Sequence, residues 1–115
     1  MALDPDCIFC KIIEGQIPAD IVFRNENVVA FNDLNPQAPT HVLIIPTLHT
    51  ENAASLAKIS ATILAALFTA ASEIAAERAL TGYRTVFNTG ADAGQSVFHA
   101  HLHLLGGRGL AWPPG

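Results

Sequence analysis

Three of the five histidines in this 115-residue chain fall within five positions, at His99, His101 and His103. If the segment is a strand, alternate side chains point to the same face, so the imidazoles lie on one side, about 6–7 Å apart at each step. The opposite face would then belong to the core, with Phe98, Ala100, Leu102 and Leu104. An imidazole can bind a metal, transfer a proton or act as a nucleophile. The cluster therefore predicts a chemical site.

A glycine-containing loop at residues 89–95 precedes the histidine segment, and Ser96 follows the loop. Glycine turns can present backbone N–H groups to an anion, and a serine hydroxyl adds another donor. Beside three histidines, this pattern indicates that the ligand carries a phosphate.

The elements that must position these residues follow from periodicity and turn signals. Residues 7–14 predict one short helix before Gly15. Apolar residues at steps of three and four predict one long central helix, which is capped at Ser55 or Ser60 and ends before Gly82. Strands are predicted at residues 21–24, 28–32, 41–45, 83–88 and 97–105. Because hairpin connections favour an antiparallel sheet, the predicted fold class is α+β, with a five-stranded antiparallel sheet.

Composition narrows the class of protein. Half of the residues are hydrophobic and 14% are charged, which excludes a disordered tail or a solvated coiled coil. One domain over residues 1–115 can bury roughly two-thirds of its unfolded surface. A net charge of −4 argues against a nucleic-acid partner. The absence of a secretory signal or an apolar span, together with only two cysteines, predicts a cytoplasmic protein with no membrane partner.

The sequence QSVFHAHLHLLGGR at residues 95–108 resembles the signature of the histidine triad (HIT) family. The segments NPQAPTH at 35–41 and WPPG at 112–115 are similar to its nucleotide-binding branch, whose members are purine nucleoside phosphoramidases. The similarity covers nearly the whole chain, from about residue 7 to residue 115. It implies a HIT-like fold, a homodimer, and hydrolysis of purine nucleoside 5′-phosphoramidates to monophosphates such as AMP or GMP.

The resemblance also implies catalytic roles. His101 matches the nucleophile that forms a covalent nucleotidyl-histidine intermediate, and a backbone carbonyl on its other ring nitrogen would fix its tautomer. His103 matches a donor to a phosphate oxygen, and Ser96 matches a residue near the leaving group. His41 matches a histidine that supports the protonation state of the triad. With the first triad histidine, His99, these residues form the expected catalytic set.

The nucleotide would be held by both halves of the chain. Asp33 matches the carboxylate that accepts hydrogen bonds from the ribose hydroxyls. Asn32 departs from relatives that carry histidine at that position. Trp112 matches a tail residue that reaches the active site of the neighbouring subunit. The resemblance assigns the base pocket to Phe9, Ile12, Phe31 and Leu34, and the ribose-phosphate contacts to Asn88, Gly94, Gln95, Ser96, Val97, His101 and His103.

Cys7 and Cys10 form a Cys-x-x-Cys motif, which by itself supplies only two of the four ligands of a closed zinc site. Some members of the family bind zinc through two such cysteines and two histidines, and His49 and His99 match those histidines. The resemblance therefore implies a structural Zn²⁺ that ties the N-terminal helix to the histidine segment. Catalysis would need no metal, because imidazole and backbone donors hold the phosphate.

Three alternatives remain open at the level of sequence. The strand histidines could be direct ligands of a catalytic metal in a metal-dependent hydrolase. The domain could be a nucleotide-binding regulatory module with little turnover. Hydrolysis of dinucleoside polyphosphates is a third possibility, against which the WPPG segment argues.

Overall fold

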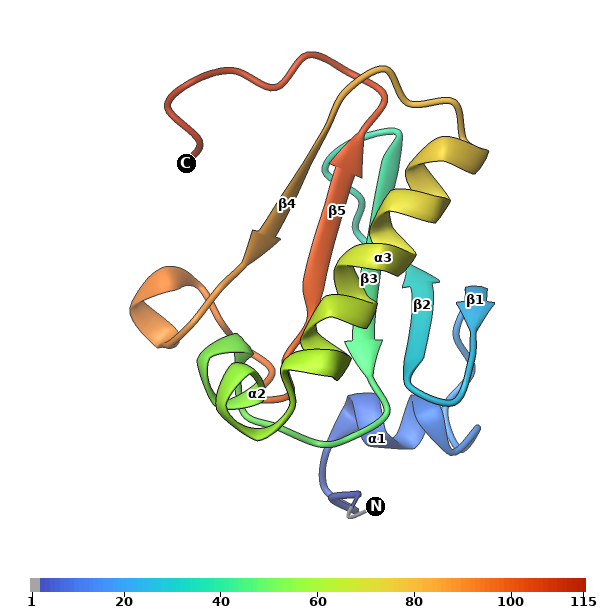
Figure 1. Cartoon of the computed structure of the whole chain (residues 1–115), viewed down its shortest axis with the longest axis vertical. Coiled ribbons are helices and arrows are strands. Elements are labelled where there is room, and N and C mark those ends of the chain that lie inside the picture. Colours follow the sequence, from blue (N-terminus) through green and yellow to red (C-terminus); the bar gives the residue numbers. More distant parts are fainter. Residues whose placement is uncertain (1–2) are drawn as a thin grey trace.

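The computed structural model describes residues 3–115 and confirms the predicted α+β class with a five-stranded antiparallel sheet (Figure 1). The elements in chain order are α1 (Ile8–Ile13), β1 (Ile21–Arg24), β2 (Val28–Asn32), β3 (Thr40–Pro46), α2 (Ala53–Ile59), α3 (Ala61–Glu77), β4 (Tyr83–Phe87), the short 3-10 helix η1 (Ala91–Ala93) and β5 (Leu102–Gly106). The predicted hairpin of β1 and β2 is present.

The sheet has the strand order β1-β2-β3-β5-β4, and every neighbouring pair is antiparallel. Helix α3 packs across β2, β3 and β5, as Figure 1 shows. Because side chains alternate along β3, Val42 and Ile44 pack beneath α3, whereas Leu43 and Ile45 pack on the other face with residues of α1. His103 pairs with Leu43 in the register of β3 and β5, so it lies on the α1 face of the sheet.

Helix α1 is short because its two ends are set locally. The thiol sulfur of Cys7 accepts a hydrogen bond from the N–H of Cys10 and caps the first turn. Gly15, with φ at +78°, ends the helix in the left-handed region that favours glycine. The helix buries Phe9, Cys10 and Ile12 against the sheet. The short helix predicted at residues 7–14 is therefore present, as α1.

The predicted long central helix is present as α3, which begins after Ser60, but the residues before Ser60 form a separate short helix, α2. Ser60 has extended backbone angles (φ −155°, ψ 95°), and its hydroxyl oxygen accepts a hydrogen bond from the N–H of Ile63. The cap predicted at Ser60 is therefore correct, but a separate helix capped by Asn52 precedes it. Helix α3 ends at Glu77, five residues before Gly82. None of the helices in residues 3–115 has the length and apolar content needed to cross a membrane.

The predicted strand at residues 97–105 is wrong at its start, since β5 begins at Leu102. Just before it, the N–H of Ala100 donates to the carbonyl of Thr50 at 2.8 Å, and residues 97–99 are bent. Phe98 is consequently 46% exposed and does not join the core, whereas Ala100, Leu102 and Leu104 are buried as predicted. His99 and His101 thus lie on irregular backbone, where neighbouring elements must fix their rings.

Candidate active site

His101 lies immediately before β5, and its ring is buried against Phe9. The two ring centroids are 5.1 Å apart in an edge-to-face arrangement. Nδ1 of His101 is 2.8 Å from the carbonyl oxygen of His99. Because a carbonyl oxygen only accepts hydrogen bonds, Nδ1 carries the proton of the neutral ring and Nε2 carries the lone pair. The predicted backbone partner is present, and it holds His101 in the tautomer that a nucleophile requires.

His103 is positioned by a chain of hydrogen bonds that begins at a backbone amide. The N–H of Gln37 donates to Nδ1 of His41 at 3.0 Å, which places the proton of a neutral His41 on Nε2. That Nε2 is 2.9 Å from Nδ1 of His103, so His41 donates and His103 accepts. The proton of His103 is then on Nε2, which is buried and forms no hydrogen bond within residues 3–115. His103 therefore offers an N–H donor beside His101, with ring centroids 5.0 Å apart.

Burial keeps both of these histidines neutral. Removal from water disfavours the charged imidazolium and lowers the pKa of His41, against the opposing effect of the Asp33 carboxylate. Burial, followed by the neighbouring His101 and His41, lowers the pKa of His103 to about 4. At pH 7 both rings are neutral, as the hydrogen-bond chain requires.

The glycine-containing loop before Ser96 is held together by the side chain of Gln95. Its amide oxygen accepts a hydrogen bond from the N–H of Gly90 at 2.9 Å. Its amide nitrogen donates to the carbonyls of Glu51, at 2.7 Å, and Val97, at 3.1 Å. Gln95 is 4% exposed, so its side chain braces the loop, and ligand contacts are left to the backbone and to the exposed hydroxyl of Ser96.

The apolar residues expected around a base form one cluster between α1 and the sheet. Phe9, Ile12 and Phe31 are each at most 7% exposed, and the rings of Phe9 and Phe31 pack edge to face at 5.7 Å. Val97 packs against the same cluster. Leu34, in contrast, is 98% exposed after β2, so the structure does not bring it into this cluster.

Asp33 lies directly beside the histidine chain. Its Oδ2 is 3.4 Å from Nε2 of His41, and its Oδ1 accepts from the N–H of Asn35 at 2.8 Å. Asn32 has a different role, since its side-chain amide bridges Asp20, at 2.7 Å, and Arg78, at 3.1 Å. The position at which relatives carry histidine is therefore used here in a structural hydrogen-bond network.

Three other expected ligand residues lie at the margins of the site. Asn88 follows β4 and is half-buried, and Gly94 ends η1 with φ at +96° and open space beside its Cα. Trp112 is 83% exposed in the tail that leaves β5. Figure 1 shows that this tail leaves the end of β5 opposite to the segment that carries His101, and Arg84 of β4 holds the carbonyl of the preceding residue, Ala111.

Cys7, Cys10, His49 and His99 meet in one cluster, whose four ligand atoms all lie within 4.8 Å of one another. Nδ1 of His99 is 3.4 Å from Sγ of Cys7 and 3.5 Å from Sγ of Cys10. Nδ1 of His49 is 3.3 Å from Sγ of Cys10 and 3.1 Å from Nδ1 of His99. Two Sγ atoms and two Nδ1 atoms therefore face a common centre.

These separations fit a tetrahedral zinc site. With Zn–S near 2.3 Å and Zn–N near 2.0–2.1 Å, the edges of a tetrahedron are about 3.5 Å between sulfur and nitrogen and about 3.3 Å between nitrogens. Nε2 of His99 donates to the carbonyl of Pro46 at 2.9 Å, which leaves the lone pair on Nδ1 to face the cluster. Burial raises the pKa of the Cys10 thiol to about 11, and a bound cation would displace that proton.

Both ring nitrogens of His99 are occupied in this arrangement, one by the Pro46 carbonyl and one by the cluster. The carbonyl oxygen of His99, in turn, receives the proton of His101. The cluster therefore contacts the nucleophile candidate through backbone, and the His99 ring has no nitrogen left for a phosphate.

A cavity of about 530 Å³ adjoins the cluster on its solvent side. Cys7, His49 and Ser96 are part of its wall, with Ile8 and Phe98 as the large apolar neighbours. Its wall also carries the carboxylates of Asp4, Asp6 and Glu51, and neither His101 nor His103 lines it.

Two groups in this site escaped the sequence reasoning, the N–H of Gln37 and the carbonyl of Pro46. Both act through the backbone, so their residue types carry no signal. The proline loop before His41 was recognisable in sequence, but the direction of one of its amides depends on the folded loop.

A family model described as "Scavenger mRNA decapping enzyme C-term binding" matches residues 6–109. The chain belongs to the histidine triad family, as the triad segment and the fold indicate together. A HIT family hydrolase from Legionella pneumophila superposes with a TM-score of 0.92 at 47% identity, covering 96% of this chain and 100% of the other.

Two relatives carry functional names. The 14 kDa zinc-binding protein of Zea mays is 47% identical over 116 residues, covering 97% of this chain and 90% of that protein. The purine nucleoside phosphoramidase of Escherichia coli is 43% identical over 107 residues, covering 91% of this chain and 90% of that protein. The chain is thus similar over nearly its full length to a purine nucleoside phosphoramidase and to a zinc-binding protein.

Proposed function

We propose that this protein hydrolyses the P–N bond of purine nucleoside 5′-phosphoramidates through a covalent intermediate on His101. The observation that carries the proposal is the tautomer pair at the site: a lone pair on Nε2 of His101 beside an N–H on Nε2 of His103. A nucleophile and an adjacent donor are what phosphoryl transfer to a histidine needs.

In the first step, Nε2 of His101 attacks the α-phosphorus, the P–N bond breaks, and the leaving amine takes a proton from solvent by way of the exposed Ser96 hydroxyl. His103 donates its Nε2–H to a non-bridging oxygen, where negative charge develops. In the second step, water attacks the phosphorus and releases His101. The sum consumes one water and gives a nucleoside monophosphate, such as AMP or GMP, and an amine.

The nucleoside end is assigned to the N-terminal half of the chain. Asp33 accepts hydrogen bonds from the ribose hydroxyls in this proposal, and its Oδ2 already faces the histidine chain at His41. The apolar cluster around Phe9 and Phe31 is the platform for the base. The E. coli relative, by its name a purine nucleoside phosphoramidase, supports a purine substrate.

Zn²⁺ is proposed as a structural ion at Cys7, Cys10, His49 and His99, supported by the edge lengths of the cluster and by the zinc-binding relative. When bound, the ion would cross-link α1, the segment after β3 and the segment before β5. The reaction needs only imidazole and backbone donors at the phosphate. The Asp33, His41 and His103 cluster is a poor alternative metal site, because Gln37 places a proton on the His41 nitrogen that would have to bind the ion.

We also propose a homodimer, which two features of the fold support. Strand β4 is an edge of the sheet, with its outer hydrogen-bonding groups free to pair. The exposed aromatic side chains Phe68 and Tyr83 flank this edge, with Phe68 packed on Phe87. A second copy paired at β4 would cover them, and sedimentation equilibrium at micromolar concentration should give twice the chain mass of 12.2 kDa.

The experiment that tests the function is turnover of adenosine 5′-phosphoramidate by the wild type and by His101→Ala, each with and without a strong chelator. We expect chelator-resistant activity in the wild type and a loss of at least about 10³-fold in the variant, with AMP binding retained. Wild-type turnover by His101→Ala would refute the nucleophile. AMP binding without turnover in the wild type would favour the regulatory module, and activity lost to chelator without unfolding would favour a catalytic metal.

A further inference from the structure

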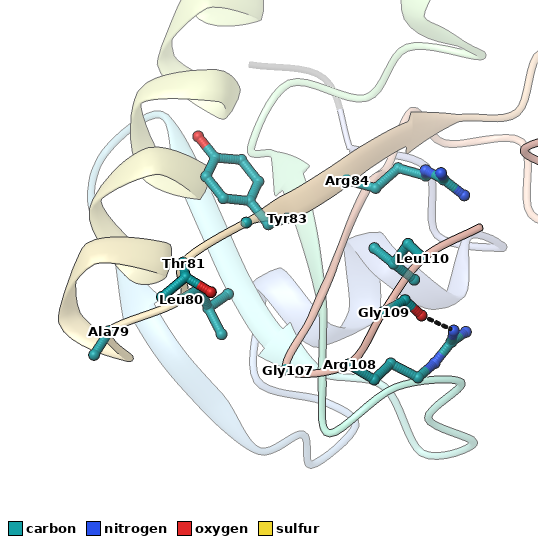
Figure 2. A pocket seen from close by; sticks show the side chains of 10 residues that line it. Ala79, Leu80, Thr81, Tyr83, Arg84, Gly107, Arg108, Gly109 and Leu110 are labelled. Carbon is teal, nitrogen blue, oxygen red and sulfur yellow. Dashed lines mark hydrogen bonds between the residues drawn. The ribbon is translucent and has the colours of Figure 1, made fainter. Parts of the chain in front are cut away.

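A hollow of about 630 Å³ lies between the α3–β4 connection and the segment after β5, and no histidine lines it. Figure 2 shows Arg84 and Arg108 projecting on the same side of this hollow, and no carboxylate lines it. Two guanidinium groups in one hollow suggest an anion site at first sight. Their hydrogen bonds point to another role.

Both guanidinium groups hold backbone carbonyls. Arg84 donates from Nη2 to the carbonyl of Ala111 at 3.0 Å, within the tail. Arg108 donates from Nη1 to the carbonyl of Gly109 at 2.8 Å, which Figure 2 shows, and from Nε to the carbonyl of Gln37 at 3.1 Å. The last bond differs from the others because it leaves the hollow and reaches the proline loop before β3.

Gln37 is the residue whose amide sets the tautomer of His41. Its carbonyl is held by Arg108, and its N–H donates to Nδ1 of His41. The same loop is braced a second time, since a Cβ at Gly107 would lie only 2.9 Å from Cβ of Pro39. Gly107, with φ at +89°, therefore lets the backbone after β5 approach the loop closely. A hydrogen bond and a close contact from adjacent residues fix the loop.

We infer that Arg108 is a positioning residue for the reaction, which acts through the backbone of Gln37 on the tautomers of His41 and His103. The carbonyl and the N–H of Gln37 lie in adjacent peptide planes joined at its Cα, so a hydrogen bond to the carbonyl restrains the backbone of Gln37 and, with it, the direction of the N–H toward His41. The restrained N–H keeps the proton of His41 on Nε2 and so the proton of His103 on its own Nε2. Without Arg108, the loop can rotate the amide away, and either ring can take its other tautomer. His103 then presents a lone pair, in place of a donor, to the phosphate. The catalytic part of this inference rests on the proposed function.

Arg84→Met is the matched control for Arg108→Met, because it removes the other guanidinium of the same hollow and leaves the Gln37 loop untouched. The direct readout is the nitrogen-15 chemical shifts of the imidazole nitrogens, which distinguish protonated from unprotonated nitrogen. In Arg108→Met we expect the His41 and His103 shifts to move toward an average of the two tautomers. In Arg84→Met we expect wild-type shifts, and in Arg108→Lys a partial return, because an ammonium group can still donate to the Gln37 carbonyl.

The kinetic readout separates positioning from binding. For adenosine 5′-phosphoramidate we expect Arg108→Met to lower kcat about tenfold, the size of one lost positioning hydrogen bond, with KM changed less than about twofold. Arg84→Met should leave kcat unchanged, because it does not touch the Gln37 loop. A purely structural role for Arg108 would lower the unfolding midpoint without moving the imidazole shifts.

Wild-type imidazole shifts in Arg108→Met, or equal changes in Arg84→Met, would overturn the inference. If Arg108→Met does not fold, Arg108→Ala is read in the same way. Absence of turnover in the wild type would instead refute the proposed function, because the shifts report on Arg108 whether or not the protein is active.

Discussion

Sγ of Cys7 is both a proposed zinc ligand and the N-cap acceptor of α1. Replacement of Cys7 by serine separates these two roles. Sγ of Cys7 accepts from the N–H of Cys10 at 3.4 Å and also faces Nδ1 of His99 at 3.4 Å. Serine is a favoured N-cap residue, so Cys7→Ser keeps the cap of α1. It removes one of the two thiolates and with it the preference for zinc. The change therefore reports on the ion alone.

The size of the effect follows from linkage. At free zinc about a thousandfold above its dissociation constant, binding stabilises the folded state by about 4 kcal/mol. A chain of 115 residues unfolds with an entropy of about 0.24 kcal/mol/K, so this corresponds to a Tm higher by about 17 °C. We expect the zinc-loaded wild type to exceed Cys7→Ser by about that amount. Turnover at 25 °C should change less, since the ion contacts His101 only through the His99 backbone.

The assay is thermal unfolding by circular dichroism of both proteins, with zinc and with a chelator. In chelator the two should unfold within about 2 °C of each other, because the cap is retained. A wild type that unfolds at the same temperature with and without zinc would refute the site. A variant that is much less stable than the wild type in chelator would show that Sγ of Cys7 stabilises the fold without an ion.

Three further outcomes are expected. Asp33→Asn should raise KM for a ribonucleoside phosphoramidate about tenfold or more, the effect of a lost charged hydrogen bond; equal KM for ribose and 2′,3′-dideoxyribose substrates in the wild type would contradict the ribose contact. The pKa of His103 lies at about 4 in the folded state, below the ordinary value of 6.5. Between pH 4 and pH 6.5 the unfolded chain therefore binds more protons than the folded chain, so stability falls as the pH drops from 6.5 toward 4. Urea midpoints in chelator should therefore fall more steeply over this window for the wild type than for His103→Gln; parallel curves would count against a buried neutral His103. Ala79 lies two residues after the end of α3, with φ at +55°, and Ala79→Gly should raise stability by about 0.5–1 kcal/mol, since glycine adopts this conformation without strain; a lower urea midpoint would contradict this.

Much of the fold was predictable because its signals are local. The hairpin, the short helix and the edge strands have apolar patterns and turn residues that no distant contact overrides. The separate helix α2 was not predicted, because the apolar period runs on through Ser60, where the hydroxyl oxygen caps α3 and the backbone is extended. The prediction of the last strand was wrong at residues 97–101, where the N–H of Ala100 donates to the Thr50 carbonyl. The strand pairing of β5 begins only at Leu102.

The amino-acid sequence by itself determined which groups of this protein can do chemistry. Side-chain types are a property of the chain, so the alternating histidines, the Cys-x-x-Cys pair and Asp33 were candidates before any fold was known. Only the tertiary structure decided what each imidazole does. The carbonyl of His99, the carbonyl of Pro46 and the amide of Gln37 select the tautomers of three different rings. Every residue but proline carries the same backbone groups, so their direction is set by packing and is invisible in the sequence.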